Sequence, residues 1–366
     1  MQVAIDATPL LQPLTGIGVF TAAIARELTA RDDVDLTAFT VTWRGRHRLA
    51  DGIDASIGRR GWPVPARATH WLWARAPFPP AELVAGRADL YHGTNYVVPP
   101  SARRAMVVSV HDLVSVHHPE WCTAPVRQFP VLIQKAIDRG AWVHADSEHM
   151  AAAIRDEFDV EPERVVSVPL GADAPAAIDH APRGQTTAPY LLALGTIEPR
   201  KDHPTLVAAF DRLAGDHPEL RLVVAGADGW GVGPFDRALA DAVHSDRIER
   251  RGYVSDAERH ALLTGADVLV YPSLDEGFGL PPLEAMQLGI PVVATAVGSI
   301  PEVVGDAAEL APPGDVDALA GAMSRALEPD RAATLASAGP QRARQFTWKR
   351  TAAGLCQLYE GAIDSV

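Results

Sequence analysis

The feature that most constrains the fold is a repeated alternation between short apolar runs and longer helix-like stretches. Each run is rich in β-branched residues and is followed by Gly, Pro, Asp or Ser, without the in–out alternation of a strand that has one face in water. Strands of this kind are covered by helices on both faces, which is typical of parallel α/β sheets. The runs span residues 2–6, 34–40, 89–93, 105–112, 142–146 and 164–171 in the first half, and 190–195, 220–226, 247–254, 267–273, 291–296 and 308–313 in the second.

The two series of runs indicate two domains. A chain of 366 residues exceeds one ordinary core. Small residues and proline without periodicity occur between the two series, and we place the interdomain linker there, at residues 181–189. We therefore predict two doubly wound, Rossmann-like α/β domains, at residues 1–180 and 190–345, followed by a C-terminal helix within 346–366. Ligands of such sheets bind beyond the carboxyl ends of the strands, so we expect the functional site in a cleft between the domains.

The composition is typical of a soluble globular protein, with 47% hydrophobic and 22% charged residues. No stretch approaches eighteen uncharged apolar residues, and the N-terminus lacks a basic flank before an apolar run, so neither a spanning helix nor a signal peptide is expected. The two cysteines, Cys122 and Cys356, lie far apart and outside any metal-ligand spacing. We expect buried packing thiols in a protein of the reducing cytoplasm.

The net charge of −13 argues against nucleic acid as a partner, but residues 43–104 contain ten arginines and only four acids. This basic stretch could contact anionic lipid headgroups, peripherally at the inner face of the membrane, or hold an anionic acceptor. The alternative is a solvated loop with tryptophans packed beneath it. The aromatic residues interleaved with the arginines are Trp43, Trp62, Trp71, Trp73 and Phe78.

Residues 276–284, EGFGLPPLE, place two glutamates around a predicted strand-to-helix corner. Pro281 and Pro282 suit the first turn of a helix that follows the run 267–273. Free N–H groups at the start of this helix, together with the helix dipole, would bind phosphate, and the glycines would let the ligand approach the backbone. The residues of this predicted turn are Gly277, Phe278, Gly279 and Leu280.

The two glutamates would contact hydroxyl groups. Glu284, about one turn into the helix, would point its carboxylate at a ribose, and Glu276, at the strand end, would face a sugar. In the competing interpretation, Glu284 interacts only with the helix dipole and Glu276 is a surface loop residue. This stretch alone leaves both interpretations open.

Two glutamates separated by seven residues, with GFGLPPLEAM between and around them, closely resemble the signature of retaining glycosyltransferases of the GT-B fold, in particular glycosyltransferase family 4. The resemblance implies the GT-B fold and a final helix that crosses back to the first domain, with Trp348 as a packing anchor. Further elements of the family pattern follow in the expected order over most of the chain, at residues 15–20, 110–121, 146–158, 195–202 and 251–258.

The segment GTIEPRKD, which begins at Gly195, looks like the donor-phosphate segment of the family. The planar guanidinium of Arg200 and the compact ammonium of Lys201 suit a diphosphate whose charge grows as the glycosidic bond breaks. The resemblance implies that this pair binds that diphosphate, and Glu198 could orient it. The alternative is that the pair only supports the next helix.

His111 stands beside Asp112 at the end of a predicted strand. The resemblance implies that the histidine contacts the transferred sugar and that its main-chain carbonyl group faces the developing oxocarbenium ion. The alternative is a buried histidine bonded to Asp112. In the segment at 251–258, the backbone of Tyr253 would bond the nucleobase, and Ser147 is the expected N-cap of the helix that follows it.

Gly16 and Gly18 follow the first run and look like part of a dinucleotide fingerprint. The third glycine position is Thr21, so the pattern is weak evidence for NAD. The resemblance implies a glycine loop against the donor phosphate and the acceptor, and the alternative is a purely structural turn.

Together these features predict a retaining hexosyltransferase that moves a sugar from a nucleotide diphosphate to a glycan or lipid-linked hydroxyl group. The resemblance implies a front-face reaction in which the departing phosphate accepts the acceptor's proton, so that neither Glu276 nor His111 acts as a covalent nucleophile. We expect no cofactor and no metal, because Arg200 and Lys201 would neutralise the charge that a divalent ion otherwise neutralises.

The motifs look most like those of bacterial mannosyltransferases, which favours GDP-mannose as the donor. UDP-sugars and deoxysugar donors such as dTDP-rhamnose remain alternatives. A nucleotide-sugar epimerase, a noncatalytic nucleotide-sugar-binding subunit and a nicotinamide oxidoreductase are rival functions.

Overall fold

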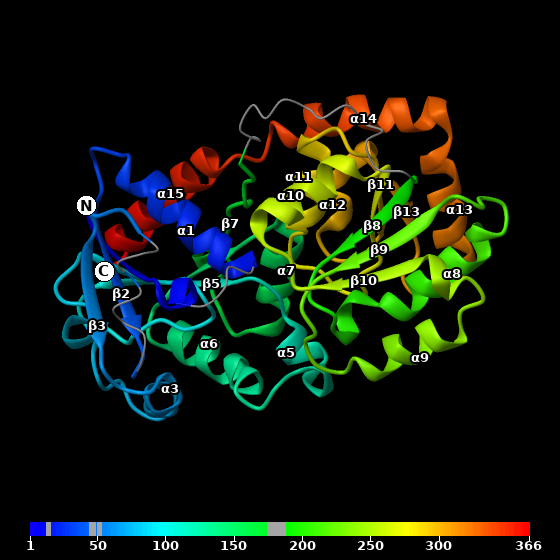
Figure 1. The fold of residues 1–366 in the computed structure, drawn as a ribbon. Helices are drawn as coiled ribbons and strands as arrows, with labels where there is room; N and C mark the ends of the chain where they lie inside the picture. The colour runs from blue at the N-terminus through cyan, green and yellow to red at the C-terminus, as the bar shows by residue number, and fades with distance from the viewer. Residues whose placement is uncertain (12–15, 44–48, 50–52, 174–187) are drawn as a thin grey trace. The chain divides into compact units, whose positions relative to one another are not determined.

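The structure is a computed structural model that describes residues 1–11, 16–43, 49, 53–173 and 188–366. It divides into unit 1, Met1–Gly171 with Trp348–Val366, and unit 2, Ala172–Thr347, which we describe separately (Figure 1). Most of the predicted linker, residues 181–187, lies outside the described residues.

Unit 1 is built on a parallel sheet with the order β3-β2-β1-β4-β5-β6-β7. Its strands are β1 (Gln2–Asp6), β2 (Asp35–Val41), β3 (Gly58–Trp62), β4 (Leu90–Gly93), β5 (Ala105–Val110), β6 (Trp142–Ala145) and β7 (Val165–Ser167). Its helices are α1 (Gly16–Thr29), α3 (Ala66–Trp73), α4 (Ala81–Val84), α5 (Val114–His117), α6 (Phe129–Asp138), α7 (Glu148–Glu157) and α15 (Trp348–Asp364), with 3-10 turns η1 (Thr8–Leu11), η3 (Pro119–Trp121), η4 (Val126–Gln128) and η5 (Pro162–Arg164).

Unit 2 repeats this arrangement with the parallel order β10-β9-β8-β11-β12-β13. Its strands are β8 (Tyr190–Leu194), β9 (Arg221–Ala225), β10 (Ile248–Gly252), β11 (Val268–Tyr271), β12 (Val292–Thr295) and β13 (Glu309–Ala311). Its helices are α8 (His203–Ala214), α9 (Gly233–Asp241), α10 (Asp256–Gly265), α11 (Leu280–Gln287), α12 (Ile300–Val304), α13 (Val316–Leu327) and α14 (Pro329–Ala343), with 3-10 turns η6 (Pro199–Lys201), η7 (Ser245–Arg247) and η8 (Gly305–Ala307).

The predicted fold class is confirmed, because each of the twelve apolar runs contains a strand and both sheets have the doubly wound strand order. One strand, β3, was missed. Its sequence, GRRGW, is largely exposed and pairs only with β2 at the sheet edge. An edge strand buries little surface, so it carries no apolar run.

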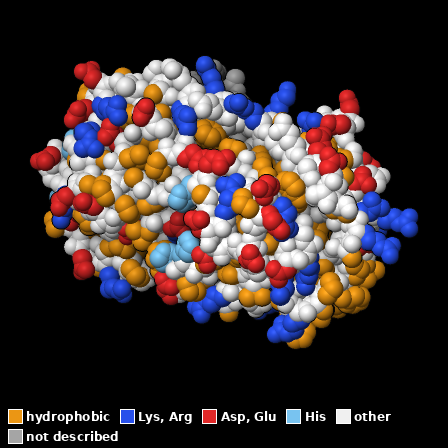
Figure 2. All heavy atoms as spheres, turned by 180° about the vertical axis from the view of Figure 1, so that it is seen from behind, with side chains coloured by type: hydrophobic (Ala, Val, Ile, Leu, Met, Phe, Trp, Pro, Cys, Tyr) orange, Lys and Arg blue, Asp and Glu red, His pale blue; other side chains and the backbone are white. Residues whose placement is uncertain are grey.

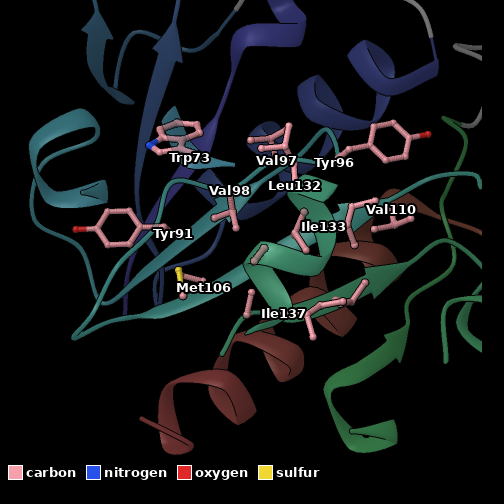
Figure 3. Packing of buried hydrophobic residues seen from close by; sticks show 14 of the residues in the cluster. Trp73, Tyr91, Tyr96, Val97, Val98, Met106, Val110, Leu132, Ile133 and Ile137 are labelled. Carbon is pink, nitrogen blue, oxygen red and sulfur yellow. The ribbon is translucent and has the colours of Figure 1, made fainter. Parts of the chain in front are cut away.

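Each sheet is covered on both faces, as the continuous runs predict. In unit 1, helices α3, α4, α6 and α7 pack with residues of the strands and loops in one buried cluster, part of which Figure 3 shows. Helices α1 and α15 pack against each other on the opposite face (Figure 1). In unit 2, the buried core includes Phe210 of α8 and Met323 of α13, both fully buried. Burial of one such side chain stabilises the fold by about 1.5–3 kcal/mol.

Three local predictions are confirmed. Ser147 caps α7, and its hydroxyl oxygen accepts a hydrogen bond from the Met150 N–H at 3.0 Å. Trp348 begins α15 and is buried against Phe20 of α1, with 6.4 Å between the ring centroids. Cys122 and Cys356 are both buried and neither is in a disulfide bond, as expected of packing thiols. Figure 2 shows acidic and basic side chains interspersed on the face it presents.

Candidate functional site

The sheet of unit 2 reverses its strand order between β8 and β11. The chain leaves two such neighbouring strands in opposite directions, and ligands of doubly wound sheets bind beyond the carboxyl ends at this point. Residues 195–202 follow β8, and residues 272–279 follow β11. The predicted phosphate segments therefore extend from adjacent strands to the same place.

A buried ionic cluster occupies this point. One carboxylate oxygen of Glu276, Oε2, accepts hydrogen bonds from Arg200 Nη1 at 2.7 Å and from Lys201 Nζ at 2.8 Å. The Tyr271 hydroxyl group donates to the same oxygen at 2.8 Å. Arg200 also pairs with Glu198 at 3.0 Å, as predicted. The charged side chains are all less than a fifth exposed, so Glu276 is not the surface loop residue of the competing interpretation.

The cations do not simply support the next helix. The N-cap of α8 is Asp202, whose Oδ1 accepts from the Thr205 N–H at 3.4 Å, whereas Lys201 points to Glu276 and Tyr271. Both cations therefore contribute to one polar cluster, and Asp202 rather than this pair caps the next helix.

The cluster combines two cations, Arg200 and Lys201, with two carboxylates, Glu198 and Glu276. Burial acts to raise the pKa of Glu276, but Arg200 and Lys201 outweigh burial and hold that pKa at about 2. Burial lowers the pKa of Lys201, and the neighbouring Arg200 lowers it further, while Glu276 opposes this change. A second anion beside Lys201 would stabilise its ammonium form. Such an anion would act on the pKa of Lys201 in the same direction as Glu276 and Glu198 do.

The turn before α11 has the geometry that the sequence predicts. Gly279 is the N-cap at φ +100°, and a Cβ atom there would lie only 2.6 Å from Ile300 Cδ1. Pro281 and Pro282 lie in the first turn, and Leu280 is the first helical residue. Pro281 and Pro282 carry no N–H group, and the Leu283 N–H donates to the Gly279 carbonyl oxygen at 3.3 Å, so a phosphate at this turn would be bound by N–H groups that precede Pro281.

Phe278, in the same turn, has a packing role. Its side chain is buried and lies edge-on to Phe346, with 5.8 Å between the ring centroids. Its predicted contribution to donor binding is therefore limited to its backbone, next to the buried Gly277.

Sequence reasoning missed the residues that hold Glu276 in place. Ser299 N–H donates to the Glu276 carbonyl oxygen at 3.0 Å. Gly298 has φ +53°, and a Cβ atom there would lie 2.1 Å from the same oxygen. Tyr271 is the last residue of β11 and lies within the predicted run 267–273, so it would have been found only if the end of that run had been inspected for polar side chains. The glycine at 298 gave no signal that separates it from an ordinary turn glycine.

Three further predicted donor-site residues, Gly195, Tyr253 and Glu284, belong to unit 2. Glu284 lies in α11, as predicted, and forms an ion pair with Arg259 of α10. Gly195 directly follows β8 with φ +142°. Tyr253 directly follows β10, and its side chain is 67% exposed.

His111 belongs to unit 1 and follows β5, where it is buried. Its Nδ1 lies 2.8 Å from Asp146 Oδ2, and its Nε2 lies 2.8 Å from the carbonyl oxygen of Thr94. The interpretation of a histidine bonded to Asp112 names the wrong partner, because Asp112 Oδ1 accepts instead from the Val114 N–H at 3.2 Å. The true partner follows the neighbouring strand β6.

The predicted glycine loop is helical where the structure describes it. Gly16 and Gly18 lie in the first turn of α1, and Thr15 lies outside the described residues. Thr21, at the third fingerprint position, is fully buried, and its hydroxyl group donates to the Ile17 carbonyl oxygen at 2.8 Å. Packing of the apolar face of α1 outweighs the low helix propensity of these glycines.

A second acid in unit 1, Asp6 at the end of β1, was also missed. Burial raises its pKa to about 6, although the Thr8 N–H and hydroxyl group both donate to Oδ1, at 2.8 and 2.5 Å. An acid directly after an apolar run was a signal available in the sequence.

Two features are absent from the described residues. Among these residues, no helix combines the length and the apolar character that crossing a membrane requires. Within the same ranges, no three His, Cys, Asp or Glu side chains are arranged to hold a metal ion.

Comparison with known proteins gives the family. A model of the glycosyl transferase 4-like domain matches residues 15–171, and a model of the glycosyl transferases group 1 matches residues 177–342. The chain is 29% identical to O-antigen chain mannosyltransferase B of Escherichia coli, over 98% of this chain and 100% of that protein. It is 36% identical to the MMP alpha-(1->4)-mannosyltransferase of Mycolicibacterium hassiacum, over 60% of this chain and 54% of that protein.

A solved structure supports the fold. Sucrose-phosphate synthase of Thermosynechococcus elongatus has a TM-score of 0.79 and 21% sequence identity, with 100% of both chains covered. The two family models together span most of the chain and exclude the epimerase and oxidoreductase alternatives. The chain therefore belongs to the GT-B-fold glycosyltransferases that combine a family 4-like domain with a group 1 domain.

Proposed function

We propose that this glycosyltransferase transfers mannose from GDP-mannose to a hydroxyl group of a glycan or lipid-linked acceptor, with retention of the anomeric configuration. The observation that carries the proposal is the buried cluster of Arg200, Lys201 and Glu276 at the strand-order reversal of unit 2. Two adjacent cations there are suited to the diphosphate of a nucleotide sugar.

The cluster would act mainly on the leaving group. As the bond between the sugar and the phosphate breaks, negative charge grows on the phosphate oxygens, and cations fixed in advance stabilise that charge. Lys201 is already desolvated, so its interaction with the phosphate is not weakened by water. In a front-face reaction the departing phosphate then accepts the acceptor's proton, and no protein side chain forms a bond to the sugar.

The same two cations support a reaction without a metal. A divalent ion in a phosphate-transfer site neutralises developing charge. Arg200 and Lys201 bring two positive charges to that task, and Glu198 and Glu276 orient them. Magnesium should therefore leave nucleotide binding unchanged.

Mannose is favoured by the relatives, because the two named above are mannosyltransferases. UDP- and dTDP-sugars are the alternative donors, and they would use the same cluster. The nucleobase is expected to lie near Tyr253, beyond β10, where backbone groups rather than side chains would recognise it.

Peripheral membrane contact is part of the proposal. Trp71 and Phe78 are 51% and 59% exposed, and the Arg75 guanidinium lies 4.2 Å from the centroid of the Trp71 ring. Trp73, in contrast, is buried, so the tryptophans of this stretch divide between surface and core. Co-sedimentation with anionic vesicles tests this contact.

A thermal-shift screen against GDP, UDP, dTDP and NAD tests the donor. A ligand at a hundred times its dissociation constant adds about 2.7 kcal/mol to the free energy of unfolding, which raises the melting temperature measurably. We expect stabilisation by GDP, equal in EDTA and in Mg²⁺. Stabilisation by UDP or dTDP alone would indicate a UDP- or dTDP-sugar as the donor. Stabilisation that requires Mg²⁺ would contradict the metal-independent reaction.

Glu284→Ala should mainly weaken donor binding. If the carboxylate binds the ribose hydroxyls, its removal should raise the dissociation constant of GDP about tenfold to a hundredfold, with a smaller effect on turnover at saturation. Arg259→Ala is the matched control, because it breaks the same ion pair and keeps the carboxylate. If the dissociation constant of GDP rises equally in the two variants, Glu284 acts only through Arg259.

A further inference from the structure

Three histidines and an aspartate form a buried polar layer in unit 1 that the proposed reaction does not explain. His92 of β4 and His144 of β6 are fully buried, and His111 after β5 is 8% exposed. Asp146, directly after β6, is 2% exposed. Buried polar groups are costly unless each is bonded, so the hydrogen bonds constrain where the protons are.

The hydrogen bonds of His92 and His144 form one chain through Ser109. In this chain each group donates to the next, from the Tyr359 hydroxyl group to the Val168 carbonyl oxygen. His144 Nε2 lies 2.9 Å from the Val168 carbonyl oxygen, which can only accept, so this nitrogen carries a proton. With Nδ1 of His144 as an acceptor, the Ser109 hydroxyl group donates to it at 2.8 Å and accepts from His92 Nε2 at 2.8 Å. The Tyr359 hydroxyl group then donates to His92 Nδ1 at 2.7 Å. Every member is satisfied with both imidazoles neutral.

His111 differs from both, because each of its ring nitrogens faces an acceptor. Asp146 Oδ2 lies 2.8 Å from Nδ1, and the Thr94 carbonyl oxygen lies 2.8 Å from Nε2. A neutral imidazole has only one N–H group, so it would leave one nitrogen lone pair pointing at an oxygen lone pair. Protons on both nitrogens satisfy both contacts.

We infer that Asp146 is a positioning residue for His111 and holds its ring as an imidazolium ion, which can donate hydrogen bonds but cannot act as a general base. The part of this inference that concerns substrate rests on the proposed function. A hydroxyl oxygen of the transferred sugar that shares Nε2–H with Thr94 would receive a charge-assisted hydrogen bond. The acceptor's proton must then go elsewhere, as the front-face reaction requires.

The surroundings of His111 agree with a charged ring. Burial lowers the pKa of His111, but the Asp146 carboxylate, its hydrogen bond and the Thr94 carbonyl group together raise it above the ordinary value, with a smaller contribution from Asp112. The other titratable groups that face the ring are His92 and His144, whose pKa values burial lowers, so they are neutral. The remaining contacts are the rings of Phe20 from α1 and Tyr96, with centroids 5.2 and 5.7 Å from that of His111.

The test measures the protonation of both ring nitrogens by NMR of histidine-selectively ¹⁵N-labelled full-length protein, with His111→Gln to assign the signals. In the wild type we expect both nitrogens of His111 to be protonated at pH 7. In Asp146→Asn the ring should lose one proton at pH 7, because the compensating charge is gone, and Asp146→Glu should restore it. Asp112→Asn is the matched control, since it removes a nearby carboxylate that does not bond the ring.

Two results would overturn the inference. An unprotonated Nδ1 in the wild type at pH 7 would place the shared proton on Asp146 or leave His111 neutral, and this result needs no folded variant. A His111 pKa that is the same in Asp146→Asn and the wild type would remove the role of Asp146.

The NMR measurement requires neither the nucleotide-sugar donor nor the acceptor substrate, so it is independent of the proposed function. If His111 is charged in a protein that binds no nucleotide, only the proposed function is disproved. Where activity is measurable, it should fall as the pH rises through the raised pKa of His111, and Asp146→Asn should move that fall to lower pH.

Discussion

Lys201→Ala is expected to lower turnover by about a hundredfold to a thousandfold, the range found when one fixed donor to a developing oxyanion is removed. The ammonium group is buried against the Tyr271 ring, 4.2 Å from its centroid, and points to Glu276. Alanine removes the charge that would stabilise the departing diphosphate, and the cavity admits water that screens Arg200. The measurement is the steady-state rate of sugar transfer under saturating donor.

The fold should survive this change. Glu276 keeps Arg200 and the Tyr271 hydroxyl group as partners when Lys201 is removed, so no buried carboxylate is left unpaired. Lys349→Ala is the control, because this lysine is exposed at the start of α15. Near-native turnover in a folded Lys201→Ala protein would contradict the assignment of the donor phosphate to this cluster.

Glu276→Gln should be the second most damaging change, with effects on both turnover and stability. The glutamine keeps the size of the side chain but removes the charge between two buried cations, and its amide group can accept only part of the three hydrogen bonds. Since breaking a buried ion pair costs about 3–5 kcal/mol, we expect a loss of this order in the free energy of unfolding at pH 7. Turnover should fall at least about a hundredfold, because the cations lose their orientation.

The pH dependence of this loss identifies its cause. The folded-state pKa of Glu276 is about 2 against an ordinary 4.5, so its stabilisation is fully present above pH 4.5 and is lost as the pH falls towards 2. The difference in unfolding free energy between the wild type and Glu276→Gln, measured with urea, should therefore shrink from pH 6 to pH 3. Glu219→Gln, an exposed site, should show no such trend. A difference that stays constant with pH would mean that packing, not charge, explains the loss.

The sheets could be predicted from the sequence because burial on both faces leaves a continuous apolar run. The run 267–273 contains the strand β11 for that reason, and β3 escaped prediction because Arg59 and Arg60 face solvent at the sheet edge. The turn at Gly279 was predictable for a different reason. Pro281 and Pro282 have no N–H group and a φ fixed at about −65°, both of which the first turn of a helix accommodates.

The partners of the site residues were harder to predict. Arg200, Lys201 and Glu276 were identified individually, but their convergence depends on β8 and β11 being neighbours in the sheet. His111 was paired with Asp112, its neighbour in sequence, whereas the structure pairs it with Asp146 from the next strand. Contacts between strands depend on register and side-chain direction, which a single sequence does not contain.

The most direct test of the central claim is calorimetric titration of GDP into the wild type, Lys201→Ala and Lys349→Ala, in EDTA. If the cluster in unit 2 binds the donor diphosphate, the wild type and Lys349→Ala should bind with the same affinity. The loss of one buried charge-assisted bond, at about 1.5–3 kcal/mol, should weaken binding to Lys201→Ala by about tenfold or more. Equal affinity for all three proteins, or no binding of any nucleoside diphosphate to the wild type, would contradict the claim.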